Sequence, residues 1–266
     1  MRATKTGHPT SSASISDIIS VLFFHPSGLK FHANNPKHFR NDRIVLSKGH
    51  ACPALYSAFY HSGLVSEDDM LSLRLKGRLL EGHPVPKIPF VDVGTGSLGQ
   101  GLSVAAGMAY SSKYYDKLDN RIYCITGDGE VVEGSIWEAA AFSSHYKLNN
   151  LTVFVDVNAL GQSQGTMYGH NTAIYEERFK AFGFNTLVID GHSIAAIVES
   201  LAKAKAETEK PTAVICKTLK GKGFNEKIEG KLNWHGKDLG TEFDSCIETL
   251  KGRIKRENIE YKTYAP

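Results

Sequence analysis

Residues 121–134, RIYCITGDGEVVEG, contain the turn on which the fold depends, because the apolar run Arg121–Thr126 stops at an aspartate between two glycines. A short run rich in isoleucine and aromatic residues that ends in Gly-Asp-Gly is typical of a buried strand followed by a turn. The helical pattern of Ser135–Lys147 comes next, and then a second apolar run, Leu151–Val157. This order predicts a strand–helix–strand unit in which the ends of two parallel strands lie side by side.

The same alternation runs through the rest of the chain. Short runs rich in valine, isoleucine and leucine predict strands at Arg43–Leu46, Arg121–Thr126, Leu151–Val157, Thr186–Ile189 and Thr212–Thr218. Apolar residues at helical spacing predict helices at Ile15–Phe24, Pro53–His61, Gly99–Tyr115, Ser135–Lys147, Ile174–Phe182 and Ile194–Lys205. Ser66, with Asp69 three residues later, and Ser193 stand at plausible N-caps. We therefore expect an α/β fold, a doubly wound and mostly parallel sheet with helices on both faces.

Composition and charge narrow the class of protein. Hydrophobic residues make up 41% of the 266 residues and charged residues 22%, which suits one large globular domain. The formal net charge is only +3 and the basic residues are scattered, so we expect no nucleic-acid groove, and Lys251–Lys255 reads as a solvated helix face. No apolar stretch approaches the roughly 20 residues that a membrane span needs, so we expect no membrane partner.

Cysteine usage and the two ends of the chain give further expectations. The cysteines occur singly, without CxxC spacing or a secretory leader, which favours a reducing, cytoplasmic location. Met1–Gly7 predicts no helix or strand, so we expect the first element of the fold to precede this chain. One domain is expected over residues 1–255, and the polar tail 256–266 reads as the start of a linker.

Asp128 and Asn158 follow the two strands that the predicted helix Ser135–Lys147 connects. Because parallel strands end at the same edge of a sheet, these two side chains could share one cation. Their oxygens, with a nearby carbonyl, suit Mg²⁺ or Ca²⁺, and Mg²⁺ usually completes its shell with phosphate oxygens, which implies a phosphorylated cofactor. The Gly129 amide can donate to such a phosphate near the start of the following helix. The alternative is a Gly-Asp-Gly turn that only caps this helix.

A second glycine-rich stretch, Gly94–Gly99, satisfies the pattern G-x-G-x-x-G after a strand-like run, Phe90–Val93. A dinucleotide site would need an acidic residue about 20 positions further on, at the end of a strand. Asp116 and Asp119 fall in this window but lie in polar sequence before the strand begins. The interpretation of Gly94–Gly99 as a dinucleotide (NAD) site is therefore weaker than that of a glycine-rich loop with another role.

Histidines stand beside glycine or proline in several predicted turns, namely His8, His50, His83 and His235. A single histidine of this kind is usually a surface residue or a satisfied hydrogen-bonding group. Several at strand–helix junctions favour a function, because imidazole exchanges protons near pH 7 and stabilises developing oxyanions.

These motifs together resemble one family. The run from Gly127 to Asn158 resembles the thiamine-diphosphate-binding motif, and the chain is similar to transketolase, closest to the animal form. The other matching signatures are TGHPTS at 6–11, SKGHA at 47–51, GHP at 82–84, TGSLGQG at 95–101 and WHG at 234–236. The resemblance covers nearly the whole chain, but only the first domain of a longer family member.

The resemblance implies a transferase that moves a two-carbon ketol unit from a ketose phosphate to an aldose phosphate, as in the pentose phosphate pathway. It implies thiamine diphosphate and Mg²⁺ (or Ca²⁺) as cofactors, with the metal on Asp128, Asn158 and the Leu160 carbonyl. The implied catalytic residues are His8, His235, His83 and, at contacts between the two active sites of a homodimer, Glu133. The implied cofactor contacts are Ser11, His50, Gly96, Ser97, Leu98, Gly129, Gln162, Lys220 and His235.

Several of these residues have simpler interpretations. Glu133 could be an acid favoured by the start of a helix, and Gln162 and Lys220 could be ordinary loop residues. Tyr114, Phe142, Phe154 and Phe179 are assigned to the core.

The resemblance also implies what the chain lacks. The family's pyrimidine-binding domain would have to come from the rest of a longer chain or from a second subunit, and activity is expected only with it. The alternatives are a non-catalytic, transketolase-like protein that binds cofactor or partner, or another thiamine-diphosphate enzyme, similar to deoxyxylulose-phosphate synthase or a 2-oxo acid dehydrogenase.

Overall fold

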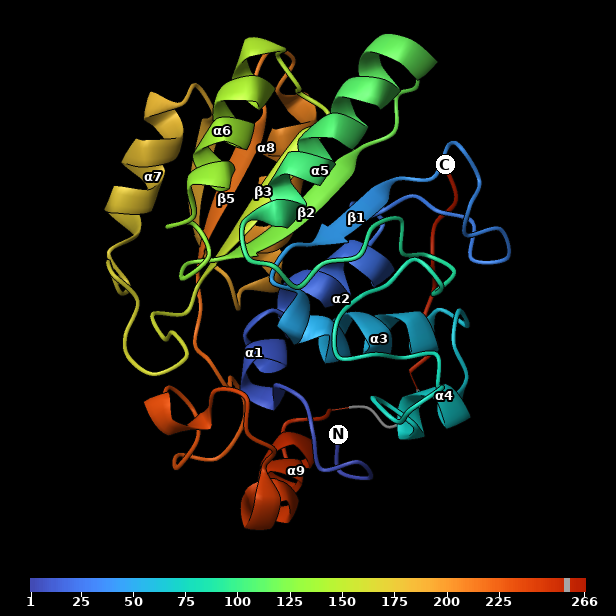
Figure 1. Ribbon diagram of the computed structural model, residues 1–266, viewed down its shortest axis with the longest axis vertical. Coiled ribbons are helices and arrows are strands. Elements are labelled where there is room, and N and C mark those ends of the chain that lie inside the picture. The colour runs from blue at the N-terminus through green and yellow to red at the C-terminus, as the bar shows by residue number, and fades with distance from the viewer. Residues whose placement is uncertain (256–258) are drawn as a thin grey trace.

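A five-stranded parallel sheet forms the centre of the molecule, in a computed structural model that describes residues 1–255 and 259–266 (Figure 1). The strand order is β1-β2-β3-β5-β4, and every neighbouring pair is parallel. The strands are β1 (Arg43–Leu46), β2 (Ile122–Gly127), β3 (Leu151–Val157), β4 (Asn185–Asp190) and β5 (Thr212–Lys217). The predicted α/β fold is confirmed, and each strand boundary lies within one residue of its prediction.

Helices cover both faces of this sheet. In Figure 1, α5 and α6 lie in front of the strands and α8 lies behind them. The α-helices are α1 (Pro9–Ser14), α2 (Ser16–Phe24), α3 (Cys52–His61), α4 (Glu67–Leu71), α5 (Gln100–Tyr110), α6 (Gly134–His145), α7 (Thr172–Ala181), α8 (Ile194–Ala206) and α9 (Phe243–Lys251). Both predicted N-caps are present, since Ser66 forms a capping box with Asp69 and the Ser193 hydroxyl accepts from the Ala196 amide.

Two hydrophobic cores follow from the alternation of side chains along the strands. Tyr123 and Ile125 of β2 pack into the core beneath α2, α3 and α8. Ile122 and Cys124, the alternate residues of the same strand, pack into the core beneath α5, α6 and α7. Because both faces of β2 are buried, its sequence is continuously apolar rather than alternating.

Two expectations about local structure are wrong. Phe90–Val93 forms no strand, since these residues lie in a turn and an extended connection. Tyr114 and Phe142 are 37% and 38% exposed, whereas Phe154 and Phe179 are fully buried as predicted. Tyr114 lies on a π-helical turn, Ser111–Asp116, that continues α5. Helical spacing places both aromatic residues on a consistent face, but there they pack against Tyr110 and Tyr146 at the surface rather than in the core.

The last described residues pack against the amino-terminal half of the domain. The Phe31 amide donates to the Tyr264 carbonyl at 2.6 Å, and the ring of Tyr261 lies 4.1 Å from that of His61 between centroids. Residues 256–258, where the predicted linker begins, lie outside the described residues.

Candidate active site

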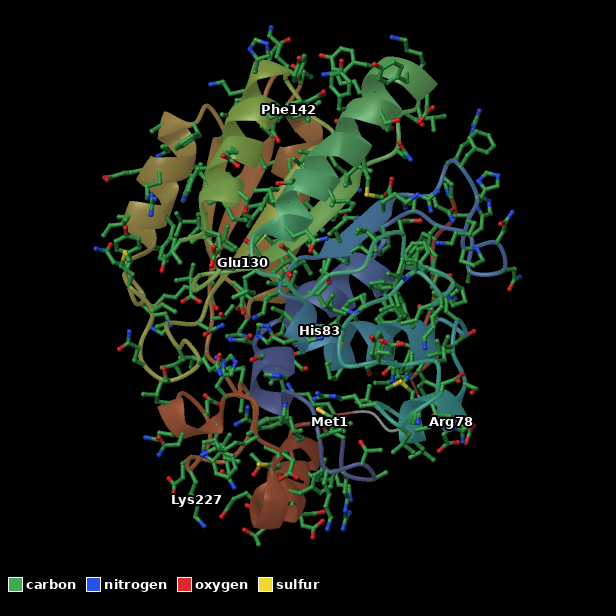
Figure 2. The ribbon with its side chains drawn as sticks, in the orientation of Figure 1. Met1, Arg78, His83, Glu130, Phe142 and Lys227 are labelled. Atoms are coloured by element: carbon green, nitrogen blue, oxygen red, sulfur yellow. The ribbon has the colours of Figure 1, made fainter. Side chains whose placement is uncertain are left out.

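A cavity of about 620 Å³ opens at the carboxyl ends of β2 and β3, where ligands bind in doubly wound sheets. It collects residues from all the quoted motifs, and Figure 2 shows Glu130 and His83 below the sheet in this region. Most of the predicted site residues line it, namely His8, His50, His83, Gly96, Leu98, Asp128, Gly129, Asn158, Leu160, Gln162, Lys220 and His235.

Three predicted site residues do not line the cavity. Ser11 is fully buried in α1, and its hydroxyl has no hydrogen-bond partner among the described residues. Ser97 and Glu133 are exposed on the surface of the chain. Glu133 is the N-cap residue of α6, but its side chain makes no capping hydrogen bond. Their predicted roles therefore remain predictions.

Asp128 is buried, and hydrogen bonds hold its carboxylate in place. Its Oδ2 accepts from the Ala159 amide at 2.7 Å and from the Thr166 hydroxyl at 2.9 Å, and its Oδ1 accepts from the Gly129 amide at 2.9 Å. Burial, and then the charge of Asp156, raise the pKa of Asp128 to about 6. Within residues 1–255 and 259–266 no lysine or arginine forms an ion pair with Asp128, so a bound cation would stabilise its charged form.

Asn158 lies beside Asp128 with its amide oriented by two hydrogen bonds. Its Nδ2 donates to Asp156 Oδ2 at 2.8 Å, and its Oδ1 accepts from the Leu160 amide at 3.1 Å. The Leu160 carbonyl accepts from Lys220 Nζ at 2.6 Å. A metal ion bound to this oxygen would therefore share it with the ammonium group or displace that group. A carboxylate, an amide oxygen and a carbonyl around one cavity fit a hard divalent cation such as Mg²⁺ or Ca²⁺.

An ion pair beneath this site was missed at the level of sequence. Lys48 Nζ contacts Asp156 Oδ2, and both side chains are almost completely buried. Burial alone would raise the pKa of Asp156, but the Lys48 charge and hydrogen bonds outweigh it and leave the pKa lowered. Asp156 also accepts hydrogen bonds from Ser14 and Thr218. Because Asn158 Nδ2 donates to the same carboxylate, Asp156 fixes the Asn158 side chain. The signal in the sequence for this ion pair was Asp156, a charged residue inside an otherwise apolar strand.

Glu130 is a second residue that sequence reasoning missed. Its Oε1 accepts from the Gly99 amide at 2.8 Å and its Oε2 from the Gly127 amide at 3.1 Å. Gly99 has φ of 88°, and a Cβ there would lie 2.4 Å from Ser135 Oγ, so only glycine fits. Burial raises the pKa of Glu130. The glutamate therefore joins the glycine-rich loop to the Gly-Asp-Gly turn.

Three histidines cluster in the same cavity, and Lys220 bridges one of them, His235, to the Leu160 carbonyl. The ring centroid of His8 lies 4.9 Å from that of His50 and 5.1 Å from that of His235. Burial, and then nearby cationic groups, lower the pKa of His8 to about 4 and that of His235 to about 3. Burial also holds the pKa of His50 far below its ordinary value. All three rings are therefore neutral near pH 7.

Cationic side chains surround these histidines. Lys220 Nζ lies 2.6 Å from His235 Nδ1, and burial followed by the Lys48 charge lowers the pKa of Lys220 to about 8. Arg74 also lines the cavity and, after burial, lowers the pKa of both His8 and His83. Although ring nitrogens of the three histidines lie within 4.8 Å of one another, this positive environment favours an anionic ligand over a second metal ion.

The topology and this cavity define a doubly wound α/β protein with a candidate site for a phosphorylated ligand at its strand ends. The chain belongs to the transketolase family: residues 1–254 match the family model described as transketolase, thiamine diphosphate binding domain. The transketolase interpretation of Gly94–Gly99 thus replaces the dinucleotide one, which also lacks the strand that it requires.

Individual relatives agree with this assignment. The chain is 51% identical to transketolase-like protein 2 of Bos taurus over 254 residues, which cover 95% of this chain and 40% of that protein. It is 48% identical to transketolase of Homo sapiens over 237 residues, 89% of this chain and 37% of that protein. The solved structure of Campylobacter jejuni transketolase superimposes with a TM-score of 0.87 at 34% identity, over 98% of this chain and 41% of that chain. The chain thus spans about 40% of the length of these relatives.

Proposed function

We propose that this chain is the diphosphate-binding part of a transketolase-type glycolaldehyde transferase. It would take part in moving a two-carbon ketol unit from a ketose phosphate to an aldose phosphate. The observation that carries the proposal is the buried Asp128 carboxylate, which lies beside Asn158 and forms no ion pair with any described lysine or arginine, in a cavity otherwise rich in basic groups. Thiamine diphosphate, when bound, supplies the electron sink that carbon–carbon bond cleavage requires.

The metal and the diphosphate would occupy the Asp128 side of the cavity. Asp128, Asn158 and the Leu160 carbonyl are proposed to hold Mg²⁺ (or Ca²⁺). Gly129 and Lys220 line the same cavity, and their N–H groups are proposed to donate to phosphate oxygens, with the Gly129 amide shared between the phosphate and Asp128 Oδ1. The remaining proposed contacts to the cofactor are Ser11, His50, Gly96, Ser97, Leu98, Gln162 and His235.

The histidine side of the cavity would receive the sugar. His8 and His235 are proposed to exchange protons with the reacting oxygens, and His83 to contact hydroxyl groups of the ketose. Their lowered pKa values support a role as neutral hydrogen-bonding groups that accept a proton only when an oxyanion or alkoxide is nearby. Glu133, on the surface, is proposed to act at contacts between the two active sites of a homodimer.

A pyrimidine-binding domain is the proposed partner, supplied by the rest of a longer chain or by a second subunit. The share of the relatives that this chain covers supports this proposal. Residues 1–255 would form the diphosphate-binding domain, and 256–266 would begin the linker to that partner. Cytoplasmic location is proposed because the cysteines of the chain are all buried and free. None of the described helices combines the length and the hydropathy needed to cross a bilayer.

A second candidate function is a non-catalytic, transketolase-like protein. Relatives named transketolase-like protein 2 from cow and mouse match at 51% and 49% identity, which supports keeping this alternative. Such a protein would bind the cofactor or a partner without transferring a ketol unit.

Complementation separates the two candidates. The chain is mixed with the remaining part of a full-length transketolase, and glycolaldehyde transfer between sugar phosphates is assayed with thiamine diphosphate and Mg²⁺. Transfer that needs both parts supports the enzyme. Cofactor binding without transfer supports the second candidate. Absence of both binding and transfer would refute the enzyme and the cofactor-binding form of the second candidate.

A further inference from the structure

A single loop supplies both hydrogen bonds to one oxygen of the candidate metal carboxylate. Asp128 Oδ2 accepts from the Ala159 amide at 2.7 Å and from the Thr166 hydroxyl at 2.9 Å. Both donors belong to the connection from β3 to α7, whereas Asp128 directly follows β2. The carboxylate therefore links the ends of two neighbouring strands.

Backbone interactions close this loop on itself. The Thr166 amide donates to the Ala159 carbonyl at 3.0 Å, and Leu160 and Gly165 form an antiparallel bridge between them. Ala159 has φ of 65°, a left-handed conformation that residues other than glycine seldom adopt. Because this conformation is not intrinsically favoured, two hydrogen bonds hold it in place: the Ala159 amide donates to Asp128, and the Ala159 carbonyl accepts from the Thr166 amide.

The Thr166 side chain is enclosed on two sides. Its methyl carbon lies 3.6 Å from the position that a Cβ would take at Gly129, so it packs over the Gly-Asp-Gly turn. Tyr175 of α7, fully buried, lies near this side chain and the Asp128 carboxylate. Burial and then the Asp128 charge raise the pKa of Tyr175 to about 12, which agrees with a dry environment around the carboxylate.

Counting acceptor sites shows what this arrangement leaves free. An ionised carboxylate offers about four lone-pair sites. On Asp128, Oδ2 uses two of them and Oδ1 uses one, for the Gly129 amide. The remaining site is on Oδ1, because the Ala159 amide and the Thr166 hydroxyl together hold Oδ2 and oppose a rotation that would offer it instead.

We propose that Thr166 is a positioning residue that orients the Asp128 carboxylate toward a divalent ion and couples it to the loop that presents Leu160 and Gln162. This inference rests on the proposed function. Neither Thr166 nor its loop neighbour Ala159 is itself a proposed ligand, so the role is exerted through Asp128.

Binding of Mn²⁺, in place of Mg²⁺, tests this inference without an activity assay. Free Mn²⁺ is followed by electron paramagnetic resonance during titration of the whole chain with excess thiamine diphosphate. Thr166→Val keeps the shape of the side chain but removes the hydroxyl, and is expected to raise the Kd for Mn²⁺ about 10- to 100-fold. Thr166→Ser keeps the hydroxyl and should stay within about threefold of the wild type, as should Thr208→Val, on the exposed connection before β5.

The outcomes distinguish the inference from the proposed function. If the wild type binds Mn²⁺ and Thr166→Val binds it equally well, only the positioning role is overturned. If the wild type binds no Mn²⁺ with thiamine diphosphate, the proposed metal site fails in this chain and this inference with it, whereas the complementation assay decides the proposed function. Urea unfolding without metal checks that each variant is folded, and Thr166→Ala replaces the valine variant if that one is not.

Discussion

At the scale of the residue, the buried pair of Lys48 and Asp156 matters most for stability. Lys48→Met removes the cation and leaves the Asp156 carboxylate buried with hydrogen bonds but without its ion-pair partner. Breaking a buried pair in this way typically costs about 3–5 kcal/mol, so we expect a loss of this size in the free energy of unfolding. Urea denaturation at pH 7 measures it.

A matched control is the ion pair of Lys147 and Glu209, whose side chains are 64% and 63% exposed. Lys147→Met should cost at most about 1 kcal/mol, because solvent screens exposed pairs. Equal losses in the two methionine variants would contradict the importance given to the buried pair.

His8 should contribute to destabilisation in acid. Burial, and then Arg74 and His83, lower its pKa in the folded chain to about 4, whereas an unfolded histidine titrates near 6.5. Between these values the unfolded state binds more protons, so the contribution of His8 to stability is present above about pH 6.5 and is lost as the pH falls toward 4.

Replacing this histidine isolates its contribution. His8→Gln should reduce the slope of unfolding free energy against pH by up to about one proton, or roughly 1.4 kcal/mol per pH unit, between pH 4.5 and 6.5. His145→Gln, on the exposed side of α6, is the control for replacing a histidine outside the cavity. An unaltered slope in His8→Gln would show that this ring titrates normally in the folded chain.

At the scale of the element, the strands were predictable because each is a short apolar run bounded by turn residues. β1 and β3 have the predicted limits, since burial on both faces makes most positions of a strand apolar. Helical spacing, in contrast, shows which side chains share a face but not whether another element covers that face. Tyr114 and Phe142 were therefore assigned wrongly to the core.

The site was predictable only in part, for a related reason. Asp128, Asn158 and the histidines stand in recognisable motifs, and strand ends bring them together. Lys48 is different, because its meaning lies in a partner 108 positions away in the sequence. Local patterns carry no record of such pairings, and the same holds for Thr166, 38 positions from Asp128.

At the scale of the whole molecule, the metal and the cofactor should be linked to folding. A ligand that binds only the folded chain, at about 100 times its Kd, stabilises it by ~2.7 kcal/mol. For a domain of this size such a gain corresponds to a rise in Tm of about 5–10 °C. We therefore expect thiamine diphosphate with Mg²⁺ to raise the Tm by this amount.

Differential scanning calorimetry on the wild type and on Asp128→Asn distinguishes specific binding from general binding of anions. Removing Mg²⁺ with EDTA should abolish most of the rise, because the diphosphate would then meet the buried Asp128 carboxylate without the ion between them. Asp128→Asn should show little rise with or without metal. If its Tm rose as far as that of the wild type, the basic groups Lys48, Arg74 and Lys220 alone would account for binding, and Asp128 would have no part in holding a metal ion.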